Sequence, residues 1–260
     1  MEKLVIKGLN KTFTAPDGTS FHALLDIDLT LWDRDFAVIV GPSGCGKSTL
    51  LNIVGGLETA TSGEVLVDGK EVDGPGADRG MVFQNYSLFP WLTVRENVQF
   101  GLRVKGLRKK EQQETADRFI ELVGLQEFAN ALPKTLSGGM KQRVAIARTL
   151  ANSPSILLMD EPFGALDAQT RVVMQELLMD IYRKTSTTIL FITHDIDEAL
   201  LLGSRIFVMS RRPGQLRREI RTEYQGERTH RTLVLPEFIT RKQEIMEMLW
   251  QDSAASAAGH

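Results

Sequence analysis

The feature that most constrains this chain is a glycine-rich loop in its N-terminal quarter. Residues 41–49 read Gly-Pro-Ser-Gly-Cys-Gly-Lys-Ser-Thr, which matches the pattern G-x-x-x-x-G-K-[ST]. The apolar run Phe36–Val40 precedes the loop and a helical run, Thr49–Val54, follows it. A strand, a glycine loop and a helix in this order predict a site where backbone N–H groups and the positive end of the helix hold phosphate groups.

The side chains of this loop have different predicted roles. Lys47 is expected to place a positive charge near the β- and γ-phosphates of a nucleotide, and Ser48 to offer its hydroxyl to Mg²⁺. Cys45 is either a small residue that fills the loop, which we favour, or a reactive thiol at a helix N-terminus. The predicted nucleotide-binding residues of the loop are Gly41, Pro42, Ser43, Gly44, Cys45, Gly46, Lys47, Ser48 and Thr49.

A second candidate site lies where another apolar run ends in two acids. Ile156–Met159 is followed by Asp160 and Glu161. Because strands of a parallel sheet bring their C-terminal ends to the edge where ligands bind, Asp160 is expected to hold Mg²⁺, directly or through water. Glu161 is expected to polarise an attacking water. The alternative is an exposed strand end with solvated acids, which is less favoured in a chain that also has a phosphate loop.

The order of the patterns predicts an α/β fold, in which a mostly parallel sheet carries helices on its faces. The expected strands are Phe36–Val40, Ser155–Met159, Thr188–Thr193 and Arg205–Ser210. Leu4–Lys7 and Glu64–Val67 predict antiparallel strands. Strand patterns are missing between Ser87 and about Leu150, where Thr93–Glu96 has the capping-box pattern that begins a helix. We therefore expect a helical insertion in the sheet domain.

Three regions follow from this organisation. The nucleotide-binding α/β core, with an antiparallel β-subdomain, is expected over residues 1–86 and 151–225, and the α-helical subdomain over 87–150. Residues 226–260 are expected to form a C-terminal helical tail, in which Leu233–Trp250 predicts an amphipathic helix packed against the body. A further helix over 167–183 is predicted to have one apolar face, formed by Val173, Met174, Leu177, Leu178 and Ile181.

Composition narrows the function classes. Lys and Arg number 31 and Asp and Glu 33, a net charge of −2, so no overall charge draws the chain to nucleic acid. The single cysteine excludes an intrachain disulfide and a cysteine-based metal site. No uncharged apolar run approaches the about 18–20 residues that cross a bilayer, and the charged N-terminus does not fit a signal peptide. These patterns predict a cytoplasmic protein.

A third segment connects the phosphate loop and the two acids. Leu136–Arg143 reads Leu-Ser-Gly-Gly-Met-Lys-Gln-Arg and resembles the LSGGQ-type signature of the ATP-binding-cassette ATPases. A Ser-Gly-Gly sequence before a helix is by itself only a flexible cap, but its place between a phosphate loop and an acidic strand end is specific. The resemblance covers about residues 3–220. It implies a P-loop NTPase (RecA-like) sheet core with an inserted helical subdomain, and hydrolysis of ATP with Mg²⁺.

Other residues match the same family in order. Gln84 resembles the Q-loop glutamine that senses Mg²⁺ and the attacking water, and His194 the switch histidine at the γ-phosphate. Ala165-Leu166-Asp167 resembles the D-loop. Phe13 resembles the aromatic residue that stacks on adenine, with Phe21 as the competitor because residues 14–22 look like an insertion. The resemblance implies Glu161, His194 and Gln84 as catalytic, Ser48, Gln84 and Asp160 as Mg²⁺ ligands, and Phe13, residues 41–49, Ser137, Gly138, Gly139 and Asp167 as nucleotide-binding residues.

The resemblance also implies partners. Two copies would form a sandwich dimer around two ATP molecules, each held by the phosphate loop of one copy and by Ser137 and Gly139 of the other. The run 89–98, the Leu-Ser-Gly-Gly-Met form of the signature and Ser210–Gly214 are similar to importer ATPases of the nitrate/sulfonate/taurine type. Those work with two membrane permease subunits and an extracytoplasmic solute-binding protein. We therefore expect a peripheral protein on the cytoplasmic face of the cell membrane, with no nucleic-acid partner.

Some alternatives stay open at this point. The apolar segment Ser87–Val94 predicts either packing within the helical insertion or a groove that receives a short permease helix. The motifs also fit a cassette ATPase of a lipid or drug exporter, or one that acts on nucleic acid or ribosomes. A small-molecule P-loop kinase is disfavoured because it gives Ser137–Arg143 and His194 no role. The stretch Arg205–Arg231, with eight arginines and three glutamates, predicts a solvated face or attraction to anionic lipid.

Overall fold

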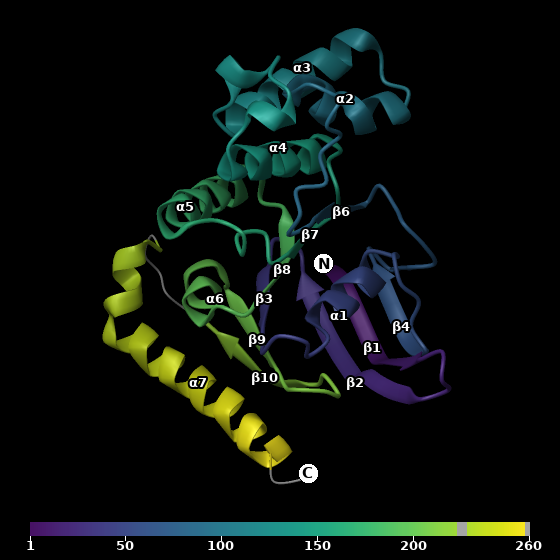
Figure 1. Cartoon of the computed structure of the whole chain (residues 1–260), viewed down its shortest axis with the longest axis vertical. Helices are drawn as coiled ribbons and strands as arrows, with labels where there is room; N and C mark the ends of the chain where they lie inside the picture. Colours follow the sequence, from purple (N-terminus) through teal and green to yellow (C-terminus); the bar gives the residue numbers. More distant parts are fainter. Residues whose placement is uncertain (223–227, 258–260) are drawn as a thin grey trace. The chain divides into compact units, whose positions relative to one another are not determined.

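A computed structural model of the chain describes residues 1–222 and 228–257 (Figure 1). The chain forms two units, one made of residues 1–76 together with the chain from Thr188 onward, and the other of residues 77–187. The sequence-based limits of the core, the helical subdomain and the tail stay a prediction. That tail includes residues 226, 227 and 258–260, which lie outside the described residues.

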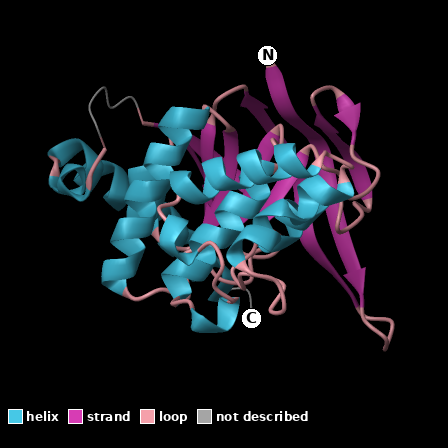
Figure 2. Ribbon diagram, turned by 90° about the horizontal axis from the view of Figure 1, so that it is seen from above, coloured by secondary structure: helices cyan, strands magenta, loops and turns pink. Residues whose placement is uncertain are grey.

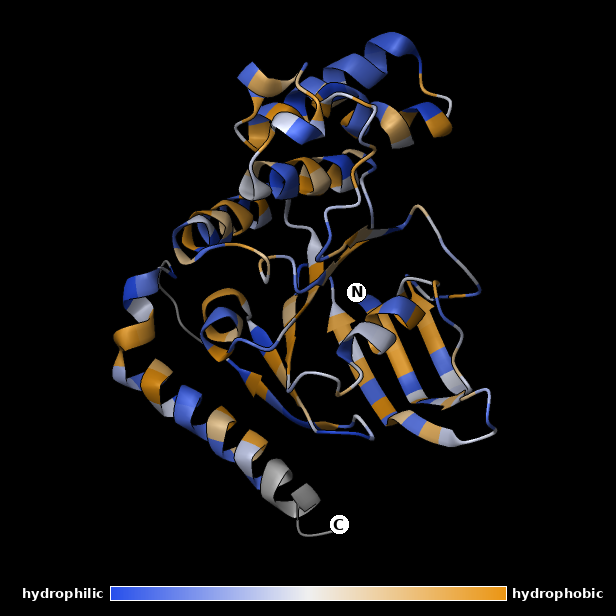
Figure 3. Cartoon of the chain, in the orientation of Figure 1, coloured by the Kyte–Doolittle hydropathy of each residue, from blue (hydrophilic) through white to orange (hydrophobic). Residues whose placement is uncertain are grey.

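The first unit contains an antiparallel sheet with the strand order β2-β1-β4-β5. Its strands are β1 (Glu2–Thr14), β2 (Ser20–Trp32), β4 (Ser62–Val67) and β5 (Lys70–Glu71). Hydrophobic and polar residues alternate along them (Figure 3), as expected for a sheet with one face against the core. Leu4 pairs with Val67, so the predicted antiparallel pairing is confirmed. Residues 14–22 form the tip of the β1–β2 hairpin, in which Thr14 pairs with Ser20; their interpretation as an insertion stays a prediction.

The same unit contains a second group of strands in the order β10-β9-β3-β8. The central strand β3 (Phe36–Val40) is parallel to both β8 (Thr188–Thr193) and β9 (Arg205–Met209). Every residue of these three strands is buried, which explains their continuous apolar sequences. The unpredicted strand β10 (Leu216–Arg221) is antiparallel to β9. Helices α1 (Lys47–Val54) and α6 (Ile196–Leu202) follow β3 and β8.

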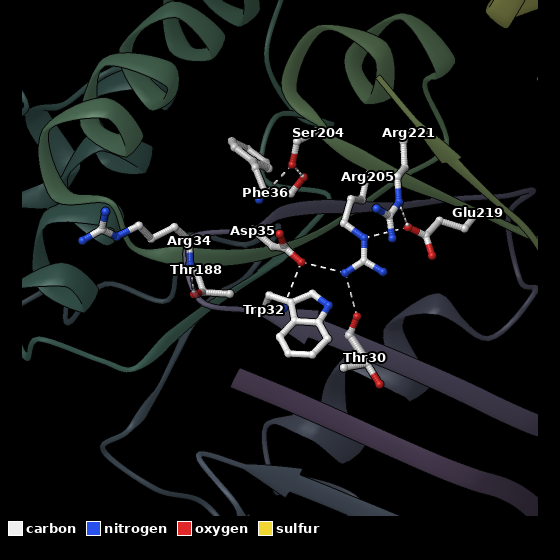
Figure 4. A network of polar contacts seen from close by, with 10 residues as sticks. All are labelled: Thr30, Trp32, Arg34, Asp35, Phe36, Thr188, Ser204, Arg205, Glu219 and Arg221. Carbon is white, nitrogen blue, oxygen red and sulfur yellow. Dashed lines mark hydrogen bonds and ion pairs between the residues drawn. The ribbon is translucent and has the colours of Figure 1, made fainter. Parts of the chain in front are cut away.

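An ion cluster in this unit overturns part of the prediction for the arginine-rich stretch (Figure 4). The Arg205 guanidinium donates from Nη1 to Asp35 Oδ2 at 2.6 Å and to the Thr30 carbonyl at 2.7 Å. Its Nε donates to Glu219 at 2.7 Å. Arg205 is therefore buried and paired rather than part of a solvated face, and it connects β9 to β2, to β10 and to the residue that precedes β3.

The C-terminal helix confirms the amphipathic pattern of the tail. After the 3₁₀ turn η3 (His230–Val234), helix α7 spans Pro236–Ala257 and packs on α6, η3 and β9. Phe238 and Ile245 are buried, whereas Ile239 is 44 % exposed and lies off the packed face. The helix begins later than predicted, at Pro236. Proline suits the first turn because N–H groups there have no acceptor within the helix, so a residue without an N–H loses no hydrogen bond.

Helices make up most of the second unit (Figure 2). They are α2 (Val94–Val104), α3 (Lys109–Leu122), α4 (Gly138–Ala151) and α5 (Ala168–Thr185), with 3₁₀ turns η1 (Gln126–Phe128) and η2 (Pro133–Thr135). Thr93 and Glu96 form the predicted capping box at the start of α2. Of the predicted apolar face of α5, Met174, Leu178 and Ile181 are buried, whereas Val173 is 47 % exposed. Across the described ranges, the chain has no helix with the length and hydropathy of a membrane span.

Two parallel strands complete the second unit. Strand β6 (Arg79–Val82), which the sequence did not predict, pairs with β7 (Ile156–Asp160), and Val82 lies opposite Met159. Strand β7 begins and ends one residue later than predicted, so Asp160 is its last residue. The two strands therefore bring the segments after Val82 and Met159 to one edge.

Candidate nucleotide-binding site

The phosphate loop lies in the first unit, between β3 and α1. Gly44 and Gly46 have φ values of 76° and 109°, a region that only glycine adopts readily. A Cβ at Gly46 would also lie 2.9 Å from the Ala23 carbonyl oxygen and 2.8 Å from the side chain of Leu24. Gly46 is the N-cap of α1 and has no side chain to cap it. The first turn of α1 therefore presents its backbone N–H groups toward the loop, as a phosphate site requires.

Lys47 is held inside this loop. Its ammonium group donates to the carbonyl oxygens of Gly41 at 2.8 Å and Pro42 at 3.1 Å, and its side chain is almost completely buried. Cys45 is buried beside it. The Cys45 N–H donates to the same Pro42 carbonyl at 3.4 Å, so an N–H group and the ammonium group converge on one acceptor inside the loop. This is the charge distribution that a phosphate group needs.

Both candidates for adenine stacking lie together. Phe13 and Phe21 are paired across the β1–β2 hairpin, with ring centroids 5.6 Å apart. Lys11 Nζ lies 4.6 Å from the centroid of Phe13, and the Arg212 guanidinium 5.0 Å from that of Phe21. The two rings form a single aromatic pair with a cation on each, so the choice between them stays open.

His194 leaves the sheet at the same edge as the phosphate loop. Strands β3 and β8 are parallel, and Val40 lies opposite Thr193. Gly41 and His194 are therefore the first residues after these two neighbouring strands. The turn at His194 is braced, because the Thr193 hydroxyl donates to the buried Glu198 at 2.6 Å and accepts the Asp195 N–H at 3.0 Å. The side chain of His194 is exposed.

The acids and Gln84 gather in the second unit in the same way. Val82 of β6 lies opposite Met159 of β7, so Gln84, two residues after β6, and Asp160, the last residue of β7, lie at neighbouring strand ends. Glu161 has a φ of 40°, an uncommon value for a residue other than glycine, and its carbonyl oxygen accepts the Gly164 N–H at 3.1 Å. A Cβ at Gly164 would lie 3.1 Å from Gln84 Nε2. The turn after β7 therefore lies against the Gln84 amide.

The signature segment forms the start of α4. Ser137 is the N-cap, and its hydroxyl oxygen accepts the Met140 N–H at 3.3 Å. A Cβ at Gly138 would lie 2.8 Å from the Tyr86 hydroxyl, and one at Gly139 2.6 Å from the Thr170 methyl group. Close approach by neighbouring elements thus requires both glycines. Tyr86 and Thr170 were missed in the sequence, which carries no local signal for these long-range contacts.

Asp167 begins the next helix beside the signature. Its carboxylate accepts the Thr170 N–H at 3.0 Å and the Thr170 hydroxyl at 2.7 Å. These two hydrogen bonds hold the pKa of the Asp167 carboxyl below its ordinary value. A hollow of about 380 Å³ lies next to this cap and is lined in part by Ser137, Gly139 and Gln169. The signature and the D-loop segment therefore form one exposed surface.

The apolar segment after Gln84 is fixed on one side and open on the other. The buried Asn97 amide holds it from α2, accepting from the Phe89 N–H at 2.9 Å and donating to the Leu92 carbonyl at 2.9 Å. Arg148 donates to the Ser87 carbonyl at 2.7 Å, and burial lowers the pKa of its guanidinium. Trp91 remains 71 % exposed. Both interpretations of the segment thus have support, since it packs internally and also presents apolar surface.

A groove lies beside this segment. It has a volume of about 380 Å³, and its lining includes Phe89, Phe100, Gly101 and Val104. The rings of Phe89 and Phe100 are 4.4 Å apart and form its apolar wall. Val104, at the end of α2, is 73 % exposed. A short apolar helix is a suitable occupant for a groove of this kind.

A phosphate loop at the end of a buried parallel strand defines the class of this protein, a P-loop nucleoside triphosphatase. Comparison with known proteins is more specific. The family model described as ABC transporter matches residues 24–164. The chain belongs to this family of ATP-binding cassettes, binds ATP and is an ATPase.

Relatives match over most of the chain. The nitrate import ATP-binding protein of Synechocystis sp. is 50 % identical over 252 residues, which cover 95 % of this chain and 94 % of that protein. The taurine import ATP-binding protein of Pelagibacter ubique is 46 % identical over 254 residues, 96 % of each chain. Among solved structures, a dimeric ATP-binding cassette in a post-hydrolysis state, bound to ADP and Pi, is 36 % identical with a TM-score of 0.73, covering 84 % of this chain and 98 % of that one. The predicted fold class and family are confirmed.

Proposed function

We propose that this chain is the ATP-hydrolysing subunit of a membrane importer, closest in type to those for nitrate, sulfonates and taurine. The observation that carries this proposal is the similarity to nitrate and taurine import ATP-binding proteins over about the whole length of both chains. These relatives favour import over export or action on nucleic acid. The transported solute is then a small molecule. Because the ligand of this chain is ATP, the solute would bind to the partner subunits.

Two copies form the working unit in this proposal, with an ATP molecule at each end of the interface. The phosphate loop of one copy supplies Lys47 and the N–H groups of α1, and the other copy supplies Ser137 and Gly139. The related cassette that is described as dimeric and bound to ADP and Pi supports this arrangement. The exposed surface around Ser137 and Asp167 is available for such a contact.

The catalytic roles are those that the family resemblance implies, and the positions of the residues at strand ends support them. We assign Glu161 as the base that polarises the attacking water, His194 as the residue that contacts the γ-phosphate, and Gln84 as the residue that senses the water and the metal. Glu161 and His194 follow the buried strands β7 and β8, and Gln84 lies two residues after β6; a rigid strand fixes the position of a catalytic group better than a free loop does. Phe13, with Phe21 as the alternative, is assigned to adenine.

The donor set fits Mg²⁺. Ser48, Asp160 and Gln84 offer hydroxyl, carboxylate and amide oxygens, the ligand types that Mg²⁺ binds together with phosphate oxygens and water. When bound, the ion neutralises charge on the β- and γ-phosphates. The place of Asp160 as the last residue of a buried strand supports this assignment.

The groove beside Phe89 is the proposed contact with the two permease subunits. It lies in the same unit as Gln84, and Arg148 ties its wall to the chain between Tyr86 and Ser87. Movement of a permease helix in the groove would thus be transmitted to Gln84, and so to the nucleotide, through the short segment 84–87. The protein would act at the cytoplasmic face of the membrane as a peripheral subunit, with an extracytoplasmic solute-binding protein as an indirect partner.

The docking contact can be tested with a matched pair of valines. Val104 in the groove and Val234 on η3 are 73 % and 72 % exposed. We expect Val104→Glu to reduce the fraction of the protein recovered with membranes from native cells, because burying a charged carboxylate in an apolar contact is unfavourable. Val234→Glu should not change this fraction. Equal membrane recovery of both variants and the unaltered protein would contradict a permease contact at this groove.

A further inference from the structure

The β9–β10 hairpin ends in a loop that the proposed function does not use. Residues 210–215, here called the hairpin loop, include the sequence Arg-Arg-Pro-Gly. The loop is held internally, since the Ser210 N–H donates to the Gln215 carbonyl at 2.9 Å and the Gln215 N–H donates to the Ser210 hydroxyl at 3.0 Å. It has a defined conformation, although its two arginines are exposed.

The hairpin loop also lies directly against the phosphate loop. The Gly214 N–H donates to the Ala23 carbonyl at 3.0 Å, and its carbonyl accepts the Leu25 N–H at 3.0 Å. A Cβ at Gly214 would lie 2.2 Å from the Cys45 carbonyl oxygen. Only a glycine can bring the backbone this close, so the two loops are in backbone contact.

Arg212 makes two contacts across this junction. Its Nε donates to the Gly44 carbonyl at 2.8 Å, and its guanidinium lies 5.0 Å from the centroid of the Phe21 ring. The first contact reaches the middle of the phosphate loop and the second reaches the aromatic pair. A planar guanidinium can donate and stack at the same time, which a lysine ammonium cannot do.

The contact with Gly44 fixes the direction of one N–H group. In a planar trans peptide the carbonyl and the N–H point in opposite directions. Arg212 holds the Gly44 carbonyl on the outside of the loop, so the Cys45 N–H in the same peptide points inward, where it donates to the Pro42 carbonyl at 3.4 Å. Lys47 Nζ donates to the same Pro42 carbonyl at 3.1 Å.

We propose that Arg212 is a positioning residue of the ATP site, which holds the Gly44–Cys45 peptide in the orientation that presents the Cys45 N–H to the nucleotide phosphates. Its cation–π contact with Phe21 links this peptide to the aromatic pair at the adenine end. The residue acts on binding of the phosphates and takes no part in the hydrolytic step. Its removal therefore raises the KM for ATP and leaves kcat little changed.

The test compares Arg212→Gln with Arg211→Gln, which removes the same charge from the neighbouring exposed residue. Loss of one hydrogen bond from a charged donor predicts about a 10-fold rise in KM and in the Kd of a fluorescent ATP analogue for Arg212→Gln. We expect kcat within about 2-fold of the unaltered protein. An interaction that stabilises the bound substrate and the transition state equally changes KM alone. Arg211→Gln should leave KM and kcat unchanged. Arg212→Lys should restore part of the affinity, because it keeps a donor but not the stack.

A second variant acts on the same junction by a different route. Gly214→Ala pushes the hairpin loop away from Cys45 and should raise KM in the same direction. The single thiol reports on the loop directly, so alkylation of Cys45 in the absence of ATP should be several-fold faster in both variants. A KM of Arg212→Gln equal to that of Arg211→Gln would overturn the proposal. So would a fall in kcat as large as the rise in KM, in any variant that remains folded by circular dichroism.

Discussion

Val40 and Thr193 lie opposite each other in the parallel register of β3 and β8. Because of this pairing, the phosphate loop and His194 begin at adjacent points on one edge of the sheet. In the second unit, the pairing of Val82 with Met159 does the same for Gln84 and Asp160. Residues that are more than 70 positions apart in the sequence thus become neighbours because parallel strands end together.

The first prediction concerns Glu161. Glu161→Gln should bind ATP with unchanged affinity and lose turnover by about 10²–10⁴-fold, the usual contribution of a general base. Bound ATP should then hold the protein as a dimer, which light scattering after size-exclusion chromatography can measure. The exposed Glu176 on α5 provides the control, and Glu176→Gln should hydrolyse ATP normally. Full hydrolysis by Glu161→Gln would remove this residue as the base.

The shared ATP site predicts that two defective copies complement each other. In the Glu161→Gln background, Lys47→Ala should abolish ATP binding and Ser137→Arg should block the opposing surface, so neither variant should dimerise alone. A mixture contains one intact site in each mixed dimer, formed from the phosphate loop of one copy and the signature of the other. ATP should therefore produce dimers only in the mixture. Monomers in every sample would contradict a site shared between copies.

Gln142 on α4 predicts a gain in stability. It is fully buried, and within residues 1–222 and 228–257 neither polar atom of its side chain has a hydrogen-bond partner. Because an unpaired buried amide costs about 1–3 kcal/mol, Gln142→Met should raise the free energy of unfolding in urea by about 1 kcal/mol. Gln175 is also buried, but its amide is not left unpaired. Gln175→Met should therefore lower the free energy of unfolding. A destabilised Gln142→Met would contradict this account.

The ion cluster around Arg205 predicts a pH dependence of stability. The hydrogen bond from Arg205 lowers the pKa of the Glu219 carboxyl from its ordinary value of 4.5. The unfolded state therefore takes up this proton at a higher pH than the folded state does. The stabilisation by Glu219 is complete above the ordinary pKa and is lost as the pH falls through the lowered one.

The measurement for this cluster is urea unfolding at two pH values. Glu219→Gln should lower the free energy of unfolding at pH 7 by about 1 kcal/mol, and the difference should disappear in the acid range, where the unaltered Glu219 is protonated too. The exposed Glu247 on α7 is the matched control, and Glu247→Gln should show no pH-dependent difference. An equal loss for Glu219→Gln at both pH values would show that its charge does not contribute.

Local patterns predicted a large part of this fold. The apolar runs at β3 and β8 gave correct bounds because strands buried on both faces need apolar residues at every position. The capping box at Thr93 was correct because it depends only on residues three apart. The phosphate loop was recognisable because its glycines and lysine are consecutive in the chain.

Long-range contacts account for the parts that the sequence did not reveal. The burial of Arg205 depends on two ion-pair partners. Asp35 is far from it in the sequence, and Glu219 lies on another strand. The contact of Arg212 with Gly44 spans 168 positions. Gln84 and His194 are single polar residues after strands, and without the family resemblance no local pattern distinguishes them from ordinary strand ends.

The central claim is that this cassette powers a membrane importer, and its most direct test is to identify what the native protein binds. The protein would be extracted from its own membranes with a mild detergent, purified, and analysed by mass spectrometry with a measurement of stoichiometry. We predict a complex of two copies of this chain with a multi-spanning permease. Recovery of the chain only with ribosomes, with nucleic acid or with no membrane protein would contradict the importer assignment.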